Sequence, residues 1–422
     1  MIFKKNKKIK IDARNLVAST FGSNVFHLVR TVVVANLLGP YLTGLFGSIS
    51  TYLQVVGYAT LGTCESLSIY IPFYRGKKQR QKLTAFTESV FTFNLAIVCL
   101  LFLILNGVTF FSTTTFNIKL SIFLCSVLSV LTQLYTFYAA YLNGERLFTE
   151  MIAVDFCLSL LMAVFNIVGV YFLFRDGYWY GLILAYIVTV AICFYLVYKR
   201  EGFPRLRLNW TLLRPHIPTG ILLACSKSIY LLYVSGIKLF LLFFSGSTAV
   251  GYFMPSVIIL SRLTIIPKSI GSMSLPRISM LNSKDQKDVI VYKLFVKTQA
   301  YSLFWTIPLV VGGLVFMPYI FLWFLPQFES GKSIAMLVLL AGIPFCLIEN
   351  ANNVLLSLQR KRVFINLLVF SLVCLSVLLL IFQYRLPPLT ATGVSLFLTF
   401  LLYAGMLNFF VLKILMSRKR IN

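Results

Sequence analysis

Charged side chains are scarce in this sequence, and acidic ones are the scarcest. Asp, Glu, Lys and Arg together make up 12% of its 422 residues, and only 12 residues are acidic, whereas 59% are hydrophobic. A soluble domain carries about twice this share of charge and fewer apolar residues. The composition therefore excludes a soluble globule and predicts an integral membrane protein.

Residues and motifs that carry common enzyme chemistry are also missing. There are two histidines, and the eight cysteines fall within long apolar runs without CxxC or His-rich spacing, so neither a disulfide framework nor a zinc site is expected. No GxGxxG, Walker, HExxH, GxSxG or Asp-rich sugar-nucleotide motif lies in a loop long enough to present it. We therefore expect no catalytic residue, no metal and no organic cofactor.

Long apolar runs fill most of the chain. About twenty such residues cross a bilayer as a helix, and twelve runs of at least that length are bounded by charge, Pro or Gly. The pattern predicts an all-α polytopic membrane protein with twelve transmembrane helices, at residues 14–36, 44–70, 85–107, 119–141, 151–173, 179–198, 217–243, 250–272, 294–320, 333–357, 363–383 and 390–413.

The basic residues between these runs predict the orientation. With the N-terminus in the cytoplasm, 28 of the 38 Lys and Arg residues lie on the cytoplasmic side, and four lie outside, at Lys119, Arg175, Lys332 and Arg385. The positive-inside rule then places both termini in the cytoplasm. The basic N-terminal segment "MIFKKNKKIK" precedes a long apolar run without a cleavage pattern, so we expect an uncleaved first span.

Six basic residues remain inside the predicted spans. Lys268 and Lys297 lie near span ends, where a long side chain can reach the headgroups. The other four are deeper: Arg30, Lys227, Lys238 and Arg262. Because a cation at the bilayer centre costs about 2.5–3.5 kcal/mol, these four must face water, a partner or a ligand. We predict that they bind an anionic cargo.

Further polar residues line up with these cations. On the seventh span, Lys227 and Lys238 are eleven residues apart with Tyr230 between them, which puts the two cations on one helical face. On the first span, Asn15, Ser19, Ser23, His27 and Arg30 recur at steps of three and four. His27 is either a polar residue satisfied by its own helix or a proton relay.

Two other spans show the same pattern. The second carries Gln54, Tyr58 and Glu65 at steps of four and seven, and the tenth carries "ENANN", which includes Glu349, Asn350 and Asn353. Glu65 and Glu349 are the only acids well inside predicted spans. Each either pairs with a cation or binds a coupling proton or sodium ion.

The chain divides into two similar halves. The basic stretch "KREGFPRLRLNWTLLRP" at 199–215 separates six spans in residues 1–198 from six in residues 216–422. Gly39, Gly44 and the following Leu-Phe align with Gly246, Gly251 and the following Tyr-Phe at an offset of 207 residues. Each pair of glycines lies between the first two spans of its half, so we predict a tight outer turn in each and two parallel six-helix lobes.

With these features the chain resembles the multidrug/oligosaccharidyl-lipid/polysaccharide exporter superfamily, above all its polysaccharide-transporter branch, the O-antigen flippases of the Wzx type. The resemblance covers the basic N-terminus, "RTVVVANLLGPYLTGLFGS", "LGTCESLSIYIPFYRG" and the two-lobe plan. It implies two six-helix bundles around a central cavity lined by cations. Such a protein moves an undecaprenyl-diphosphate-linked oligosaccharide, an O-antigen or capsular or exopolysaccharide repeat unit, to the outer leaflet.

We therefore expect a flippase in the bacterial cytoplasmic membrane, without a chemical step, driven by a proton or sodium gradient. Its expected partners are the lipid-linked oligosaccharide and membrane lipids, with polysaccharide polymerase and chain-length proteins as candidates, and no nucleic acid. The nearest rival is a multidrug cation antiporter of the same superfamily, whose cavity would favour acids. A lipid II flippase usually has two more spans, and a membrane-embedded polymerase or acyltransferase would present a larger loop or a polar cluster.

Overall fold

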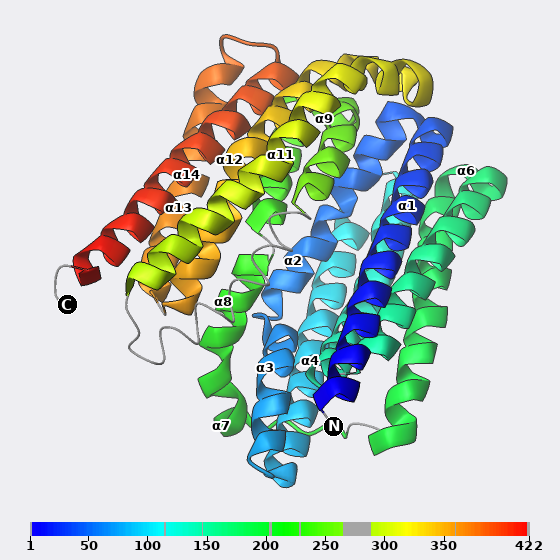
Figure 1. Ribbon diagram of the computed structural model, residues 1–422. Helices are drawn as coiled ribbons and strands as arrows, with labels where there is room; N and C mark the ends of the chain where they lie inside the picture. Colours follow the sequence, from blue (N-terminus) through cyan, green and yellow to red (C-terminus); the bar gives the residue numbers. More distant parts are fainter. Residues whose placement is uncertain are drawn as a thin grey trace. The chain divides into compact units, whose positions relative to one another are not determined.

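The computed structural model describes all residues except 1, 114, 146, 202–204, 228, 265–287, 359 and 420–422, and at some helix ends the backbone alone. The described residues form helices and no strand (Figure 1). In chain order these are α1 (Ile2–Ile49), α2 (Thr51–Ala59), α3 (Thr63–Gly76), α4 (Arg80–Phe111), α5 (Phe116–Gly144), α6 (Phe148–Glu201), α7 (Trp210–Leu213), the 3₁₀-helix η1 (Arg214–His216), α8 (Ile217–Lys227), α9 (Ile229–Leu263), α11 (Asp288–Phe324), the 3₁₀-helix η2 (Pro326–Gly331), α12 (Lys332–Ser357), α13 (Lys361–Gln383) and α14 (Pro388–Lys419).

Nine helical stretches among the described residues are long and apolar enough to cross a membrane. Three of the α-helices in these stretches contain a residue with non-helical backbone angles: Gly39 in α1, Phe174 in α6 and Gly246 in α9. Each of these residues ends one helical run and lets the chain start another. The predicted multi-pass, all-helical membrane protein is confirmed, and these three turning points mark where single stretches contain two runs.

The two glycine motifs share one backbone conformation. Gly39 has φ 72° and ψ 174°, and Gly246 has φ 77° and ψ −179°. This region is open only to glycine. Pro40 follows the break, where the first residue of a new helical run needs no hydrogen-bond donor. The same angles at an offset of 207 residues are what the predicted internal repeat requires.

The second glycine of each motif meets the other motif. A Cβ atom on Gly44 would meet the carbonyl oxygen of Ser247, and one on Gly251 would meet the carbonyl oxygen of Pro40. Any side chain at either position would force the two backbones apart. The motifs therefore fix a backbone crossing as well as a turn.

The predicted second span, 44–70, is wrong as a continuous helix. Leu61 and Gly62 both have positive φ, at 54° and 62°, and separate α2 from α3. Gly62 packs against the backbone of Gly220 so closely that a Cβ atom would meet the Gly220 carbonyl oxygen. This contact holds the break in place, so Glu65 does not continue the helical face of Gln54 and Tyr58.

Contacts divide the chain into two compact units. Unit 1 is Met1–Gly39 with Phe46–Ile229, and unit 2 is Pro40–Leu45 with Tyr230–Asn422. In unit 1 the apolar core packs α3, α4 and α5 around Leu67, Ile71, Phe86 and Phe137. In unit 2, α12 packs against α11 and α14. The predicted lobe boundaries around 199–215 rest on span counting and stay a prediction.

Helix η1 and α8 are fastened to α3 within unit 1. The Tyr74 hydroxyl lies 2.9 Å from Nε2 of His216, and the Tyr70 hydroxyl donates to Oγ1 of Thr219 at 3.4 Å. Burial lowers the pKa of His216 and so favours its neutral ring, which can accept the Tyr74 proton. The ion pair of Arg75 with Glu145, at 2.5 Å, joins α3 to the end of α5 nearby.

Replacing Gly246 with Ala tests the turn. Because Gly246 has a backbone conformation that disfavours any Cβ atom, the substitution should lower the free energy of unfolding by about 1–3 kcal/mol. Gly236→Ala, in the same helix with open space around its Cβ position, is the matched control and should be neutral or stabilising. Thermal unfolding of the purified protein in detergent measures both, and equal midpoints for the two variants would contradict the assigned turn.

Candidate functional site

In unit 1, Arg30 belongs to a half-buried polar cluster, the N-terminal cluster, formed by His27, Arg30, Tyr135, Asp155, Ser159 and Tyr186. Tyr186 interacts electrostatically with both Arg30 and Asp155. The Tyr135 hydroxyl donates a short hydrogen bond to Oδ1 of Asp155, and the Tyr135 and Tyr186 rings pack edge to face at 5.9 Å. Helices α1, α5 and α6 thus bring a cation and an acid together through two tyrosines.

One nitrogen of the Arg30 guanidinium, Nη1, could still donate a hydrogen bond to a ligand. This nitrogen is shielded from solvent and makes no hydrogen bond to any of the described residues. A buried donor without an acceptor is costly, so this group is a candidate contact for a ligand.

Sequence reasoning missed Asp155 because it lies near the start of a predicted span. In the structure α6 begins at Phe148, so Asp155 is about two turns inside the helix. The available signal was its spacing of four from Ser159, which puts both on one face.

The structure gives His27 a partner on α6. Its Nε2 lies 3.3 Å from Oγ of Ser159, which itself donates to the Asp155 carbonyl at 2.8 Å. His27 is therefore held by a neighbouring helix, and its ring connects α1 to the acid-bearing turn of α6. Either a structural or a proton-carrying role fits this contact.

The three polar residues predicted on the second span lie on two helices. Gln54 and Tyr58 are half-buried on α2, and Glu65 is half-buried in the first turn of α3. All three belong to unit 1. The break at Leu61 and Gly62 sets Glu65 apart from the other two.

In unit 2, three of the predicted residues come together. Tyr230 interacts electrostatically with both Arg262 and Glu349, which places one cation, one acid and one phenol from α9 and α12 in one region. Glu349 also interacts with Tyr403 of α14, whose hydroxyl donates to Oδ1 of Asn352 at 3.3 Å. We call Tyr230, Arg262, Glu349, Asn352 and Tyr403 the C-terminal cluster.

The remaining predicted cations lie on either side of the division between the units. Lys238 is on α9 in unit 2 and is almost fully buried. Lys227 is the last residue of α8 in unit 1, and its side chain lies outside the described residues. The predicted basic stripe of Lys227, Tyr230 and Lys238 therefore stays a prediction.

Asn350 lies in a hydrogen-bond network that joins three helices. Its Nδ2 donates to Oγ of Ser302 at 2.7 Å and to Oε1 of Gln299 at 3.2 Å, and Gln299 donates to Oδ1 of Asn408 at 2.7 Å. These bonds connect α11, α12 and α14 inside unit 2. Asn353, one residue beyond Asn352, is half-buried. The two asparagines of the predicted pair thus have different surroundings.

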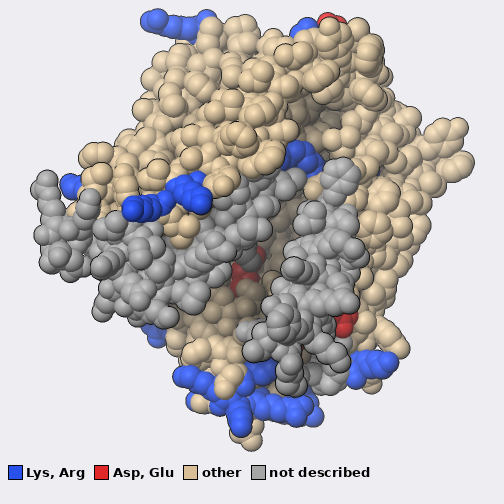
Figure 2. All heavy atoms as spheres, viewed as in Figure 1, with Lys and Arg blue, Asp and Glu red and all other residues tan. Residues whose placement is uncertain are grey.

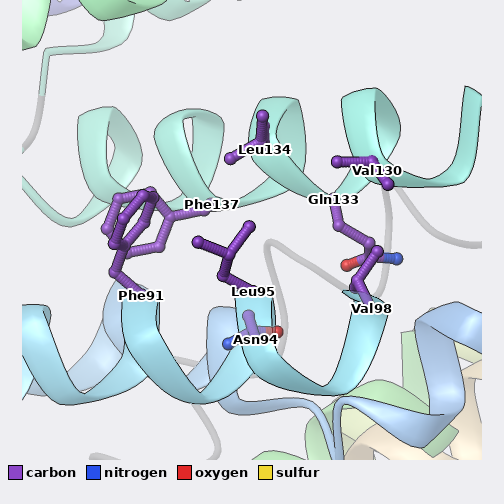
Figure 3. Close-up of a pocket in the computed structure, with 8 residues that line it drawn as sticks. All are labelled: Phe91, Asn94, Leu95, Val98, Val130, Gln133, Leu134 and Phe137. Carbon is purple, nitrogen blue, oxygen red and sulfur yellow. The ribbon is translucent and has the colours of Figure 1, made fainter. Parts of the chain in front are cut away.

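A small cavity lies between α4 and α5, and none of the predicted site residues lines it (Figure 3). Phe91, Leu95, Leu134 and Phe137 form its apolar wall, and Asn94 and Gln133 add two amides. Its volume of about 10 Å³ suits one water molecule. Among the described residues, no group of His, Cys, Asp and Glu could hold a metal ion.

Solved transporters share this arrangement of helices. The chain is similar to an inward-facing multidrug resistance MATE family transporter of the MOP superfamily, with a TM-score of 0.77 and 14% identity over 94% of this chain and 96% of that chain. It is also similar to the lipid II flippase MurJ in an inward closed conformation, with a TM-score of 0.72 and 15% identity over 93% of this chain and 86% of that one. The fold is therefore that of the MOP-superfamily transporters.

The family follows from the sequence match. The family model for polysaccharide biosynthesis proteins matches residues 13–282, so the chain belongs to the polysaccharide biosynthesis protein family. A comparison with curated protein sequences gave no match. The superfamily predicted from sequence is confirmed, and the solved structures similar to this chain include transporters and a flippase.

Alanine substitutions in α12 test whether Asn350 stabilises the packing of helices, in contrast to the half-buried Asn353. Asn350→Ala should lower the free energy of unfolding by about 1–3 kcal/mol, because it leaves Ser302 and Gln299 buried without their donor. Asn353→Ala, at a half-buried position three residues further on, is the matched control and should cost less than about 1 kcal/mol. Thermal unfolding of both variants in the same detergent measures the difference. Equal losses would show that the network contributes nothing specific.

Proposed function

We propose that this protein is a flippase that moves an undecaprenyl-diphosphate-linked oligosaccharide from the cytoplasmic to the outer leaflet of the bacterial inner membrane. The observation that carries the proposal is the set of deeply placed cations in a member of the polysaccharide biosynthesis family. A diphosphate is the part of such a cargo that most needs cationic partners, because charge-assisted hydrogen bonds strengthen as water is excluded. The Wzx-type branch fits both observations.

Each unit would then contribute cations to the cargo path. Unit 1 supplies Arg30 with its unsatisfied Nη1, and unit 2 supplies Lys238 and Arg262. Lys227 is a fourth candidate. Tyrosines accompany Arg30 and Arg262, and tyrosine offers a sugar both a hydroxyl and an apolar face.

The proposed topology has twelve spans with both termini in the cytoplasm. It is supported by nine membrane-long helical stretches in the described residues, three of which contain a turning residue. The distribution of Lys and Arg between the predicted spans supports the orientation.

We propose ion-coupled alternating access as the mechanism, with Glu65 and Glu349 as the coupling candidates. Glu349 interacts electrostatically with Tyr230, which also interacts with Arg262. Binding of a proton or sodium ion at Glu349 would thus change the field at a cargo-binding cation. The cargo-supplying partners would be the enzymes that make the lipid-linked oligosaccharide, and the polymerase and chain-length proteins would receive it.

A multidrug cation antiporter is the second candidate, and the similarity to MATE transporters favours it. Cationic drugs call for acids, whereas among the predicted deep residues four are cations and two are acids. The balance of charge therefore favours an anionic cargo. A polymerase or acyltransferase would have to turn over a lipid-linked sugar covalently.

Charge removal tests the proposed cargo path. Arg30→Gln and Arg262→Gln should each reduce glycan delivery to the outer face about tenfold or more, because each removes a charge-assisted contact with the diphosphate. Lys297→Gln is the matched control, since Lys297 is exposed on α11 and lies 5.8 Å from the Tyr301 ring centroid. Delivery is measured in cells at equal protein levels, with Arg→Lys variants as charge-preserving controls. Wild-type delivery by both Gln variants would remove these cations from the cargo path.

A further inference from the structure

The segment after α6 runs along one face of α4 in unit 1. Oγ1 of Thr92 donates to the carbonyl of Arg207 at 3.3 Å, and the backbone N–H of Asn209 donates to Oγ of Ser89 at 2.9 Å. The Trp210 ring lies 6.0 Å from that of Phe93. Ser89 and Thr92 are three residues apart, so they share a face of α4. Residues 205–212 are thus a fixed surface strap and not a loose connection.

A cleft opens where this strap reaches the start of α4. It has a volume of about 340 Å³ and is lined by Gln81, Lys82, Ala85, Asn209, Thr211 and Leu212. The carboxamide oxygen of Asn209 already accepts from the Thr211 hydroxyl at 2.7 Å and from the Leu212 amide at 3.2 Å. The remaining donors are the Lys82 ammonium and the side-chain amides of Gln81 and Asn209, which suit an anion.

The part of the strap before the cleft alternates cations with exposed apolar side chains. Arg205 and Arg207 are both exposed. Leu206 lies between them and is 63% exposed, and Leu208 follows and is 52% exposed. Apolar groups that stay exposed beside guanidinium groups are typical of surfaces that lie at a membrane interface.

The position of the strap along α4 indicates that it lies beside membrane lipid. Thr92, which holds Arg207, is ten residues from Lys82 along α4, or about 15 Å, and lies seven residues inside the predicted span 85–107. At that depth Leu206 and Leu208 would meet acyl chains, and the arginines could reach phosphates. Lys and Arg gather at the lower end of the view in Figure 2, the end where α7 lies in Figure 1.

We propose that α4 and the strap of residues 205–212 bind the phosphate of an anionic lipid in the cytoplasmic leaflet. Lys82 and the cleft amides hold the phosphate, the side chains of Arg205 and Arg207 reach toward it from further along α4, and Leu206 and Leu208 contact the acyl chains. The site lies outside the clusters that hold the predicted cargo-binding residues. It rests on the proposed orientation of the chain and not on the proposed cargo.

Lipid binding by the purified full-length protein in detergent tests the site. The probes are short-chain phosphatidylglycerol, short-chain phosphatidylcholine, undecaprenyl phosphate and inorganic phosphate. We expect phosphatidylglycerol or undecaprenyl phosphate to bind at least tenfold more tightly than phosphatidylcholine. Each cation removed should weaken binding about fivefold, so Lys82→Gln with Arg207→Gln should weaken it about 25-fold.

Lys77→Gln with Lys199→Gln is the matched control, because it removes the same charge from exposed residues that do not line the cleft. It should change affinity less than twofold, and Lys82→Arg with Arg207→Lys should restore binding. If phosphatidylglycerol and undecaprenyl phosphate compete, the site binds any lipid phosphate. If only one of them binds, that lipid is the natural ligand of the site. If both Gln pairs weakened lipid binding equally, binding would depend only on the overall surface charge, and the proposed site would be wrong. Equal binding of inorganic phosphate would overturn the lipid assignment.

Discussion

The cost of holding charge away from water governs how this chain can be arranged. A sequence with so few charged residues could have avoided deep cations altogether, yet it places Arg30, Lys238 and Arg262 within membrane-long helices. Each must be compensated by polar neighbours or by a ligand. In unit 1, Arg30 interacts electrostatically with Tyr178 and Tyr186, and Tyr186 also with Asp155. In unit 2, Arg262 and Glu349 both interact with Tyr230. The two units thus solve the same electrostatic problem with the same residue types: one arginine, one acid and aromatic hydroxyls.

This similarity extends to the backbone. The glycine turns at Gly39 and Gly246 have nearly the same angles, and each precedes a second glycine that meets the other motif. The internal duplication predicted from the sequence would account for both the paired turns and the paired clusters. In a transporter, such paired elements would give each lobe a cation for the cargo and an acid to modulate it, which is the arrangement that the proposed flippase needs.

Much of the fold could be predicted from the sequence because hydrophobic run length and glycine position are local signals. The membrane class and the turns at Gly39 and Gly246 followed from them, and the superfamily came from a resemblance to a known family. The break at Leu61 and Gly62 did not, because it depends on the close approach of Gly220, far away in the chain. Asp155 was missed because it lies near the start of a predicted span, and its partner Tyr135 lies on another helix. Asn350 shows the converse case: polar spacing suggested a lining residue, whereas its contacts with Ser302 and Gln299 join helices.

The central claim is that an anionic lipid-linked glycan is the cargo, and transbilayer movement by the purified protein tests it most directly. The full chain would be reconstituted in liposomes with an undecaprenyl-diphosphate oligosaccharide labelled on its sugar, and accessibility of the label would be followed with and without a proton or sodium gradient. The account predicts protein-dependent movement of the glycan between leaflets and no gradient-driven efflux of a cationic dye from the same liposomes. Dye efflux without glycan movement would contradict it.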